Sequence, residues 1–173
     1  MKFEEHPVLR AMIERRSVRR FTAEPVSRQA LTAVLRAGQW APSGLNNQPW
    51  RFLVVQRGDP RQEGLAACTK YAHILRGAAA CVAVLLERSA MYSEIKDHQG
   101  AGACIQNMLL ACHALGLGAV WIGQIINEQG PPLAVLGLDP ADYELQAVIA
   151  LGHPDQQGSS SRKALGELLL EEF

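Results

Sequence analysis

The sequence lacks the segments that direct a protein into or across a membrane. No apolar run approaches the roughly 20 residues that span a bilayer, and the first 14 residues mix charged and apolar side chains in a way that no signal peptide does. We therefore expect a cytoplasmic protein with no membrane partner. A chain of 173 residues is most simply one domain, which we predict over 1–173.

Signals for metal sites and disulfides are also missing. None of the four cysteines forms a C-x-x-C pair, and the five histidines form no H-E-x-x-H motif. We predict no metal site. Free thiols, buried in a reducing compartment, are expected at Cys68, Cys81, Cys104 and Cys112.

Motifs of several common enzyme classes are absent as well. The chain has no G-x-G-x-x-G after a strand, no G-x-x-x-x-G-K-[ST] and no G-x-S-x-G. No paired carboxylates stand out, and His113 is expected to pack within a helix instead of acting as a base. We therefore predict no catalytic side chain. A protein of this kind uses the chemistry of a bound cofactor.

Net charge is zero, but the charges are distributed unevenly. Seven arginines and only two acids, Glu14 and Glu24, lie between residues 10 and 36. A domain that binds duplex nucleic acid is usually basic overall, so this local charge fits a small anion better. A solvated arginine face and a nucleic-acid-binding module remain open alternatives at this point.

The hydrophobic patterns predict an α+β fold. One helix is expected to begin near Pro7 and to end near Arg15–Ser17, and a second over 28–40 with Ser27 as its N-cap. Residues 127–138 predict a turn and a short helix, and residues 59–77 a mixed, mostly helical segment. Strands are expected over 50–56, 80–87, 116–123 and 143–154. Residues 89–115 predict one long helix, either continuous or broken near Gly100. Without regular βαβ alternation, we expect the helices to surround one central sheet.

Two stretches carry a resemblance to a known family. The first is "ERRSVRRF" and the second is "WAPSGLNNQPWRFLVV", about 25 residues later. Together they resemble the nitroreductase family of FMN-dependent oxidoreductases, and "GACIQNMLLACHALGLGAVWIG", "AVIALGHP" and "SRKALGELL" follow in the family's order. The resemblance runs from about residue 8 to about residue 170.

The resemblance implies a nitroreductase-like fold with a central, mostly antiparallel sheet in an intertwined homodimer. It implies two FMN sites across the interface and a ping-pong cycle. In that cycle NADH or NADPH reduces the flavin by hydride transfer to N5, and a nitroaromatic, a quinone or a similar small acceptor reoxidises it. The helix over 100–115 would pack against its symmetry mate, and the C-terminal extension 155–173 would pack on the partner subunit.

The resemblance also assigns roles to residues. Arg15, Arg16 and Arg162 would bind the FMN phosphate, Ser17 the phosphate or ribityl chain, and Arg19 the ring near N1 and O2, where a cation stabilises the reduced flavin. Ile122 and Gly123 would pass the N5 side. The backbone of Pro42, Ser43 and Gly44 would approach the flavin from the partner subunit, with Gly44 allowing the close contact. Asn46 and Gln48 would bond to the ribityl hydroxyls and the ring edge. Tyr92 and Ile95 would lie over the flavin face, in the substrate site.

The chain departs from the family pattern at two places. Ser160 stands where many members have a lysine, and Gly123–Gln124 stands where well-known members have Glu-Gly. These departures affect FMN affinity and the neighbourhood of the nicotinamide or acceptor. The alternative is a flavin enzyme of the same fold with a dehydrogenation, dehalogenation or flavin-modifying reaction that does not use NAD(P)H.

Overall fold

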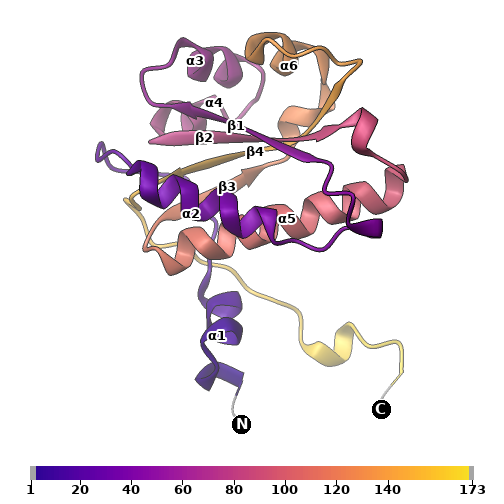
Figure 1. Ribbon diagram of the computed structural model, residues 1–173. Helices are drawn as coiled ribbons and strands as arrows, with labels where there is room; N and C mark the ends of the chain where they lie inside the picture. Colours follow the sequence, from indigo (N-terminus) through magenta and orange to yellow (C-terminus); the bar gives the residue numbers. More distant parts are fainter. Residues whose placement is uncertain (1–2, 172–173) are drawn as a thin grey trace.

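A computed structural model describes residues 3–171 as helices packed around one antiparallel sheet (Figure 1). The four strands lie in the order β1-β2-β4-β3, and every neighbouring pair is antiparallel. They are β1 (Trp50–Gln56), β2 (Ala80–Glu87), β3 (Gly118–Ile122) and β4 (Tyr143–Gly152). The α+β prediction is confirmed. The third and fourth strands are shorter than predicted, since β3 ends at Ile122 and β4 at Gly152.

The position of each strand explains its composition. β2 lies between two neighbours and is buried from Ala80 to Leu86, which accounts for its unbroken apolar sequence. β1 and β3 are the edge strands of this sheet. The free edge of β3 is the one beside which the arginine-rich segment passes.

Helices cover both faces of the sheet (Figure 1). On one face lie α2 (Arg28–Gln39) and α5 (Glu94–Ala114), and on the other lie α3 (Pro60–Ala67), α4 (Ala72–Gly77) and α6 (Gly130–Leu136). Each face has its own apolar core. The predicted N-cap of α2 is confirmed, because the Ser27 Oγ accepts a hydrogen bond from the Ala30 amide at 3.1 Å.

Helices α2 and α5 pack closely against each other at Gly38. A Cβ built at Gly38 would lie 2.8 Å from the Met108 Cγ and 3.0 Å from the Cys104 Sγ, so this position has no room for a side chain. At Gly100 and Gly102 a Cβ would meet only ordinary van der Waals neighbours. The glycine required for the packing of α2 on α5 is therefore Gly38 in α2. Gly100 and Gly102 of the long helix are not required for it.

The long helix is continuous through Gly100 but begins at Glu94, and the predicted start at residue 89 is wrong. Residues 88–90 form a separate 3-10 turn. The physical reason is a buried carboxylate: Asp97 accepts hydrogen bonds from the backbone amides of Tyr92 at 2.9 Å and Ser93 at 2.8 Å. These bonds satisfy donors at the start of α5 and fix its first residue.

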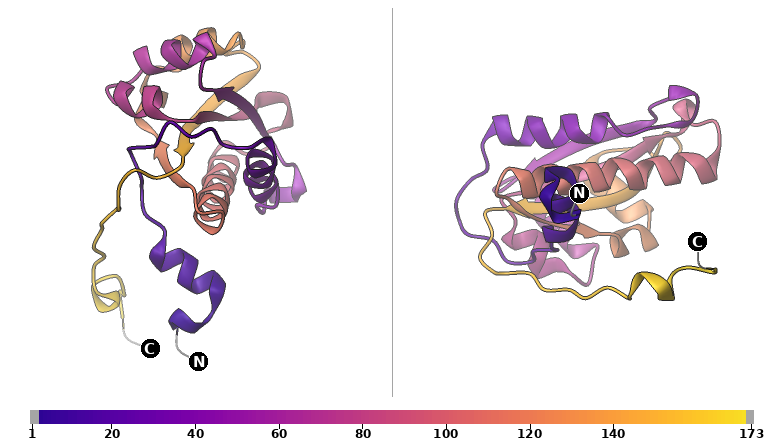
Figure 2. Two further views of the ribbon diagram at one scale, coloured as in Figure 1. Left: turned by 90° about the vertical axis from the view of Figure 1, so that its left-hand side faces the viewer. Right: turned by 90° about the horizontal axis from the view of Figure 1, so that it is seen from below.

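Two segments extend away from the body on the same side (Figure 2). One is α1 (Pro7–Glu14), which has no buried residue, and the other is the tail after residue 155, whose regular structure is one short turn (Leu165–Glu167). Both expose apolar side chains, at Val8, Met12, Leu165, Leu168 and Leu170. No helix within residues 3–171 is long and apolar enough to cross a membrane.

Candidate functional site

The arginine-rich segment is fixed along the free edge of β3. Ser17 and Ala119 form a parallel bridge, and the Val18 amide donates to the Ala119 carbonyl at 3.0 Å. A second bridge joins Phe21 to Pro154. The chain between α1 and Phe21 therefore runs beside the sheet, and the predicted residues Arg15, Arg16 and Ser17 lie where β3 begins.

Arg15 is in an environment that favours an anion. Its Nε is buried and has no hydrogen-bond partner. Burial lowers the pKa of the Arg15 guanidinium, and the nearby charges of Arg162 and Arg16 lower it further. Among the described side chains, no carboxylate forms an ion pair with these three arginines, and Glu14, which lines the same cavity as Arg15 and Arg16, pairs with Arg10 and His113 instead. A bound phosphate would satisfy the buried N–H and relieve the mutual repulsion.

The Arg16 guanidinium bonds to backbone carbonyls, and the same side chain lines a cavity. Its Nη1 donates to the carbonyls of Ile13 and, at 2.9 Å, Arg15, which holds the end of α1. Arg15 and Arg16 line a cavity of about 400 Å³ together with His113 and Gln156. Arg19 is exposed and makes no hydrogen bond or ion pair with any residue from 3 to 171.

The other end of β3 carries the predicted ring contacts. Ile122 is buried and Gly123 half-buried, and four residue steps separate Ala119 from Gly123, which is about 13 Å in a strand. This spacing and the unsatisfied Nε of Arg15 fit FMN, with its phosphate at the arginines and its ring near Gly123. The edge of β3 thus offers both ends of such a site within one chain.

Sequence reasoning missed Trp121, which lies between these two ends. Its indole is 41% exposed on a strand that is otherwise buried. A Cβ at Gly123 would lie 3.3 Å from the Trp121 Nε1, and one at Gly102 would lie 3.9 Å from the far edge of the ring. An exposed aromatic residue beside a predicted flavin contact is the signal that identifies it.

Gln124, one of the departures from the family pattern, already has partners within the chain. Its Oε1 accepts hydrogen bonds from the Thr69 Oγ1 at 2.6 Å and from the Lys70 amide at 3.2 Å. The side chain therefore joins the turn between α3 and α4 to the end of β3. Thr69 and Lys70 are brought to the site by this link and were not predicted.

The loop over 42–48 has a strained backbone. Leu45, Asn46 and Gln48 have φ values of 54°, 54° and 48°, in the left-handed region that residues other than glycine rarely adopt. Hydrogen bonds inside the loop hold this shape: the Ser43 Oγ accepts from the Gln48 amide at 3.1 Å, and the Gln48 Nε2 donates to the Asn46 carbonyl at 3.1 Å. Strain of this kind occurs most often at functional sites. Pro42, Asn46 and Gln48 are exposed.

Gly44 has no room for a side chain within its own chain. A Cβ at this position would overlap the phenol of Tyr92, so the close approach seen within the chain is to Tyr92. Ser43 and Gly44 are half-buried beneath it. Tyr92 and Ile95, the predicted substrate contacts, are 42% and 73% exposed at the start of α5.

Within one chain, the 42–48 loop and the arginines lie at opposite ends of α5. The loop contacts the helix around Asp97, whereas the cavity at Arg15 includes His113, 16 positions later. At about 1.5 Å per residue this is about 24 Å, which is longer than an extended FMN molecule. The two parts therefore cannot hold the same FMN within one subunit.

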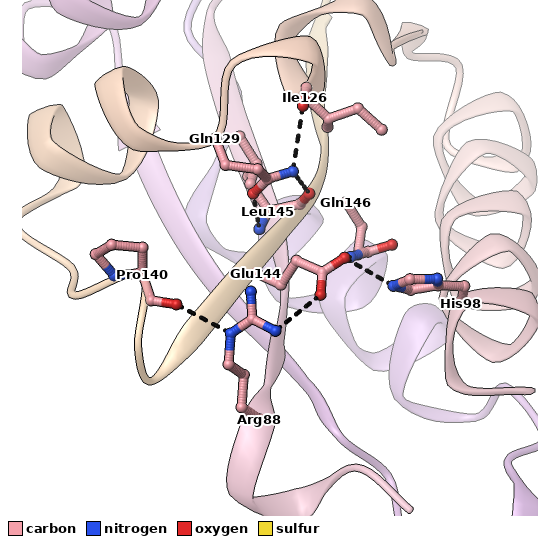
Figure 3. A network of polar contacts seen from close by, with 8 residues as sticks. All are labelled: Arg88, His98, Ile126, Gln129, Pro140, Glu144, Leu145 and Gln146. Atoms are coloured by element: carbon pink, nitrogen blue, oxygen red, sulfur yellow. Dashed lines mark hydrogen bonds and ion pairs between the residues drawn. The ribbon is translucent and has the colours of Figure 1, made fainter. Parts of the chain in front are cut away.

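A polar network fixes the sheet near the start of α5 (Figure 3). Glu144 on β4 bonds to the ring of His98 at 2.7 Å, to Arg88 at 3.3 Å and to Gln146 at 3.0 Å. Beside it, the Gln129 side chain donates to the Leu145 carbonyl and accepts from the Leu145 amide, each at 2.9 Å. Gln129 thus pairs with β4 where β3 has ended.

Residues 3–171, the part of the chain that the structure describes, contain no group of three or more metal-ligating side chains. Cys81, Cys104 and Cys112 are buried and Cys68 is half-buried, all as free thiols. Burial raises the pKa of each fully buried thiol to about 12. These thiols are packing groups and not nucleophiles.

Comparison with known proteins gives consistent matches. The model of the nitroreductase family matches residues 12–69 and 60–153. A protein of Archaeoglobus fulgidus named as a candidate NADH dehydrogenase/NAD(P)H nitroreductase is 30% identical over 86% of each chain, and one of the same name from Methanothermobacter thermautotrophicus is 32% identical over 88% of this chain and 80% of its own. A crystal structure from Desulfovibrio desulfuricans, described as a nitroreductase in complex with FMN, has a TM-score of 0.95 and 60% identity over 96% of this chain and 97% of its own.

Proposed function

This chain belongs to the nitroreductase family, and we propose that it is an FMN-dependent oxidoreductase that transfers electrons from NADH or NADPH to a small organic acceptor in a ping-pong cycle. Nitroaromatics and quinones are the acceptor classes to test first. The observation that carries the proposal is the buried Arg15 Nε without a partner, in a cluster of arginines that form no ion pair with the described acids. That cluster requires an anion of the kind FMN provides.

The residues along β3 would hold the cofactor in a fixed direction. Arg15, Arg16 and Arg162 bind the phosphate, and Ser17 contributes its hydroxyl beside them. Ile122 and Gly123 lie against the ring, and the unpaired charge of Arg19 is available beside it. Bound FMN supplies the redox chemistry, because it accepts a hydride equivalent and passes on its electrons. The protein contributes binding, orientation and positive charge.

The loop residues Pro42, Ser43, Gly44, Asn46 and Gln48 would complete the site of a second subunit. The part of α5 that the loop contacts and the part that lines the arginine cavity are about 24 Å apart along the helix, which supports this arrangement. The exposed apolar residues of α1 and of the tail, 155–173, support a homodimer in which these segments pack on the partner. Tyr92 and Ile95, next to the loop, would contact the acceptor.

The test is FMN titration followed by steady-state kinetics. Apoprotein should bind one FMN per chain, and double-reciprocal plots against NAD(P)H at several quinone concentrations should be parallel, as in a ping-pong cycle. A protein that binds no FMN would contradict the proposal. Intersecting lines would contradict the ping-pong order, and FMN binding without any NAD(P)H oxidation would favour a flavin enzyme with a different reductant.

A further inference from the structure

We propose that Asn47 and Asp97 are positioning residues that hold the 42–48 loop in the conformation in which it contacts the FMN bound by the partner subunit. The inference rests on the proposed function, and it concerns two residues that do not themselves contact the cofactor. It explains why a carboxylate and an amide are buried at the start of α5, away from the arginines that bind the phosphate.

Asp97 is the one buried carboxylate among the described side chains, at 1% exposed. Its Oδ2 accepts from the amides of Tyr92 and Ser93, and its Oδ1 accepts from the Asn47 Nδ2 at 2.8 Å. Burial alone would raise its pKa, but the hydrogen bonds from Asn47, Ser93 and Tyr92 outweigh it and the pKa is lowered. Asp97 is therefore ionised and bonded on both oxygens.

Asn47 connects this carboxylate to the strained loop. Its Nδ2 also donates to the Ala90 carbonyl at 3.0 Å, so one side chain is fixed to both the 3-10 turn and α5. Its Oδ1 is buried with no partner, so the amide is kept in place by its donors alone. The left-handed residues Leu45, Asn46 and Gln48 lie directly beside it. The other contacts of the loop with this region are the packing of Gly44 on Tyr92, just before α5, and the approach of the Pro42 carbonyl to Gly100, so the Asn47 bonds are its hydrogen-bonded link to α5.

The geometry around α5 also indicates which subunit's FMN site the loop contacts. Gly100 on α5 faces the Pro42 carbonyl, and Gly102 faces Trp121 beside the proposed ring site. Residues that are two positions apart on an α-helix point in directions about 200° apart. The helix therefore lies between the loop and the ring site of its own chain. A loop held by Asn47 and Asp97 is thus presented to another molecule.

The first test compares Asn47→Ala with Gln62→Ala. Gln62 is the control, because its side-chain amide also donates two hydrogen bonds, to the backbone carbonyls of Leu75 at 2.7 Å and Ala78 at 3.1 Å, and it lies far from the loop. Asn47→Ala should weaken FMN binding by about tenfold through loss of loop order, while Gln62→Ala changes only the denaturation midpoint. Asn47→Asp, which puts a second carboxylate beside Asp97, should weaken FMN binding at least as much. Equal FMN affinity in wild type and Asn47→Ala would overturn the proposal.

The decisive test uses hybrid dimers of differently tagged protomers, one carrying Arg15→Ala and the other Asn47→Ala. If the loop serves the partner's site, the hybrid contains one site with both parts intact, and half of its sites should bind FMN with wild-type affinity. Both parent homodimers should lack such sites. If the hybrid has no wild-type site, the loop serves its own chain or no site, and the proposal is wrong.

These outcomes distinguish a failure of this proposal from a failure of the proposed function on which it rests. Wild-type protein that binds no FMN would end the proposed function. Wild-type protein that binds FMN, with an Asn47→Ala variant that binds it equally well, would end only the role of Asn47 and Asp97. A general folding defect in Asn47→Ala cannot mimic the hybrid result, because destabilised protomers do not restore each other's affinity.

Discussion

Ser17 lies opposite Ala119 on the free edge of β3, and the adjacent Val18 amide donates to the Ala119 carbonyl at 3.0 Å. This contact places a segment with four arginines, 15–21, against the sheet. It sets the phosphate-binding charges at one end of β3 and leaves Gly123 at the other. The direction of the proposed cofactor follows from this pairing.

Replacement of Arg15 by alanine should weaken FMN binding by about 10- to 100-fold. The reason is the loss of one charge-assisted hydrogen bond, worth about 1.5–3 kcal/mol. Isothermal titration of apoprotein with FMN measures the change. Arg76→Ala is the control, since Arg76 forms only an exposed ion pair with Glu63 on the other face of the sheet. Equal affinities for the two variants would contradict the phosphate role of Arg15.

Removal of apolar contacts from the tail should dissociate the dimer. Leu168 is 62% exposed and Leu170 fully exposed within one chain. Burial of a leucine contributes about 1.5–3 kcal/mol, so Leu168→Glu should raise the dimer dissociation constant by about tenfold or more. Sedimentation velocity at micromolar concentration is the measurement. Ala134→Glu, at an exposed position on α6, should leave the association unchanged, and a wild-type monomer would refute the dimer outright.

Alanine at Gly38 should destabilise the fold. The added Cβ would lie 2.8 Å from the Met108 Cγ and 2.9 Å from its Sδ, and overpacking of this kind costs about 1–3 kcal/mol. Urea denaturation measures it. Gly77→Ala is the control because no atom lies within 4 Å of its added Cβ, and it should be neutral or slightly stabilising. A Gly38→Ala variant as stable as wild type would show that α2 and α5 can move apart freely.

The buried thiols predict both reactivity and pH dependence. The pKa of Cys81, Cys104 and Cys112 is about 12 in the folded chain, against about 8.5 when unfolded. Their stabilising contribution is complete below about 8.5 and is lost as the pH rises toward 12. A thiol-specific disulfide reagent at about pH 8 should modify only half-buried Cys68 in native protein and all four cysteines in urea. Two or more reactive thiols in native protein would contradict the packing.

The sequence predicted most of the secondary structure because apolar periodicity reports burial directly. Ser27 as a cap and the β2 apolar run are both local signals. The predicted start of α5 was wrong because the true start depends on the buried carboxylate of Asp97. From the sequence alone, an acid within a helical pattern is expected to face solvent.

The site was predictable only in part, for a related reason. The arginines and the loop are motifs that lie within short stretches of chain, so the sequence identifies them. Asn47, Trp121 and Thr69 contribute through neighbours 50, 19 and 55 positions away, namely Asp97, Gly102 and Gln124. Contacts between distant segments appear only once the chain is folded.

The central claim is that this protein carries electrons from NAD(P)H through bound FMN. The measurement that tests it most directly is the visible absorption spectrum of the FMN-loaded protein under anaerobic conditions, before and after addition of NADH or NADPH. We predict that the yellow flavin absorption bleaches with one reduced nicotinamide per FMN and returns when a quinone or nitroaromatic is added. A flavin spectrum that neither nucleotide changes would contradict the account.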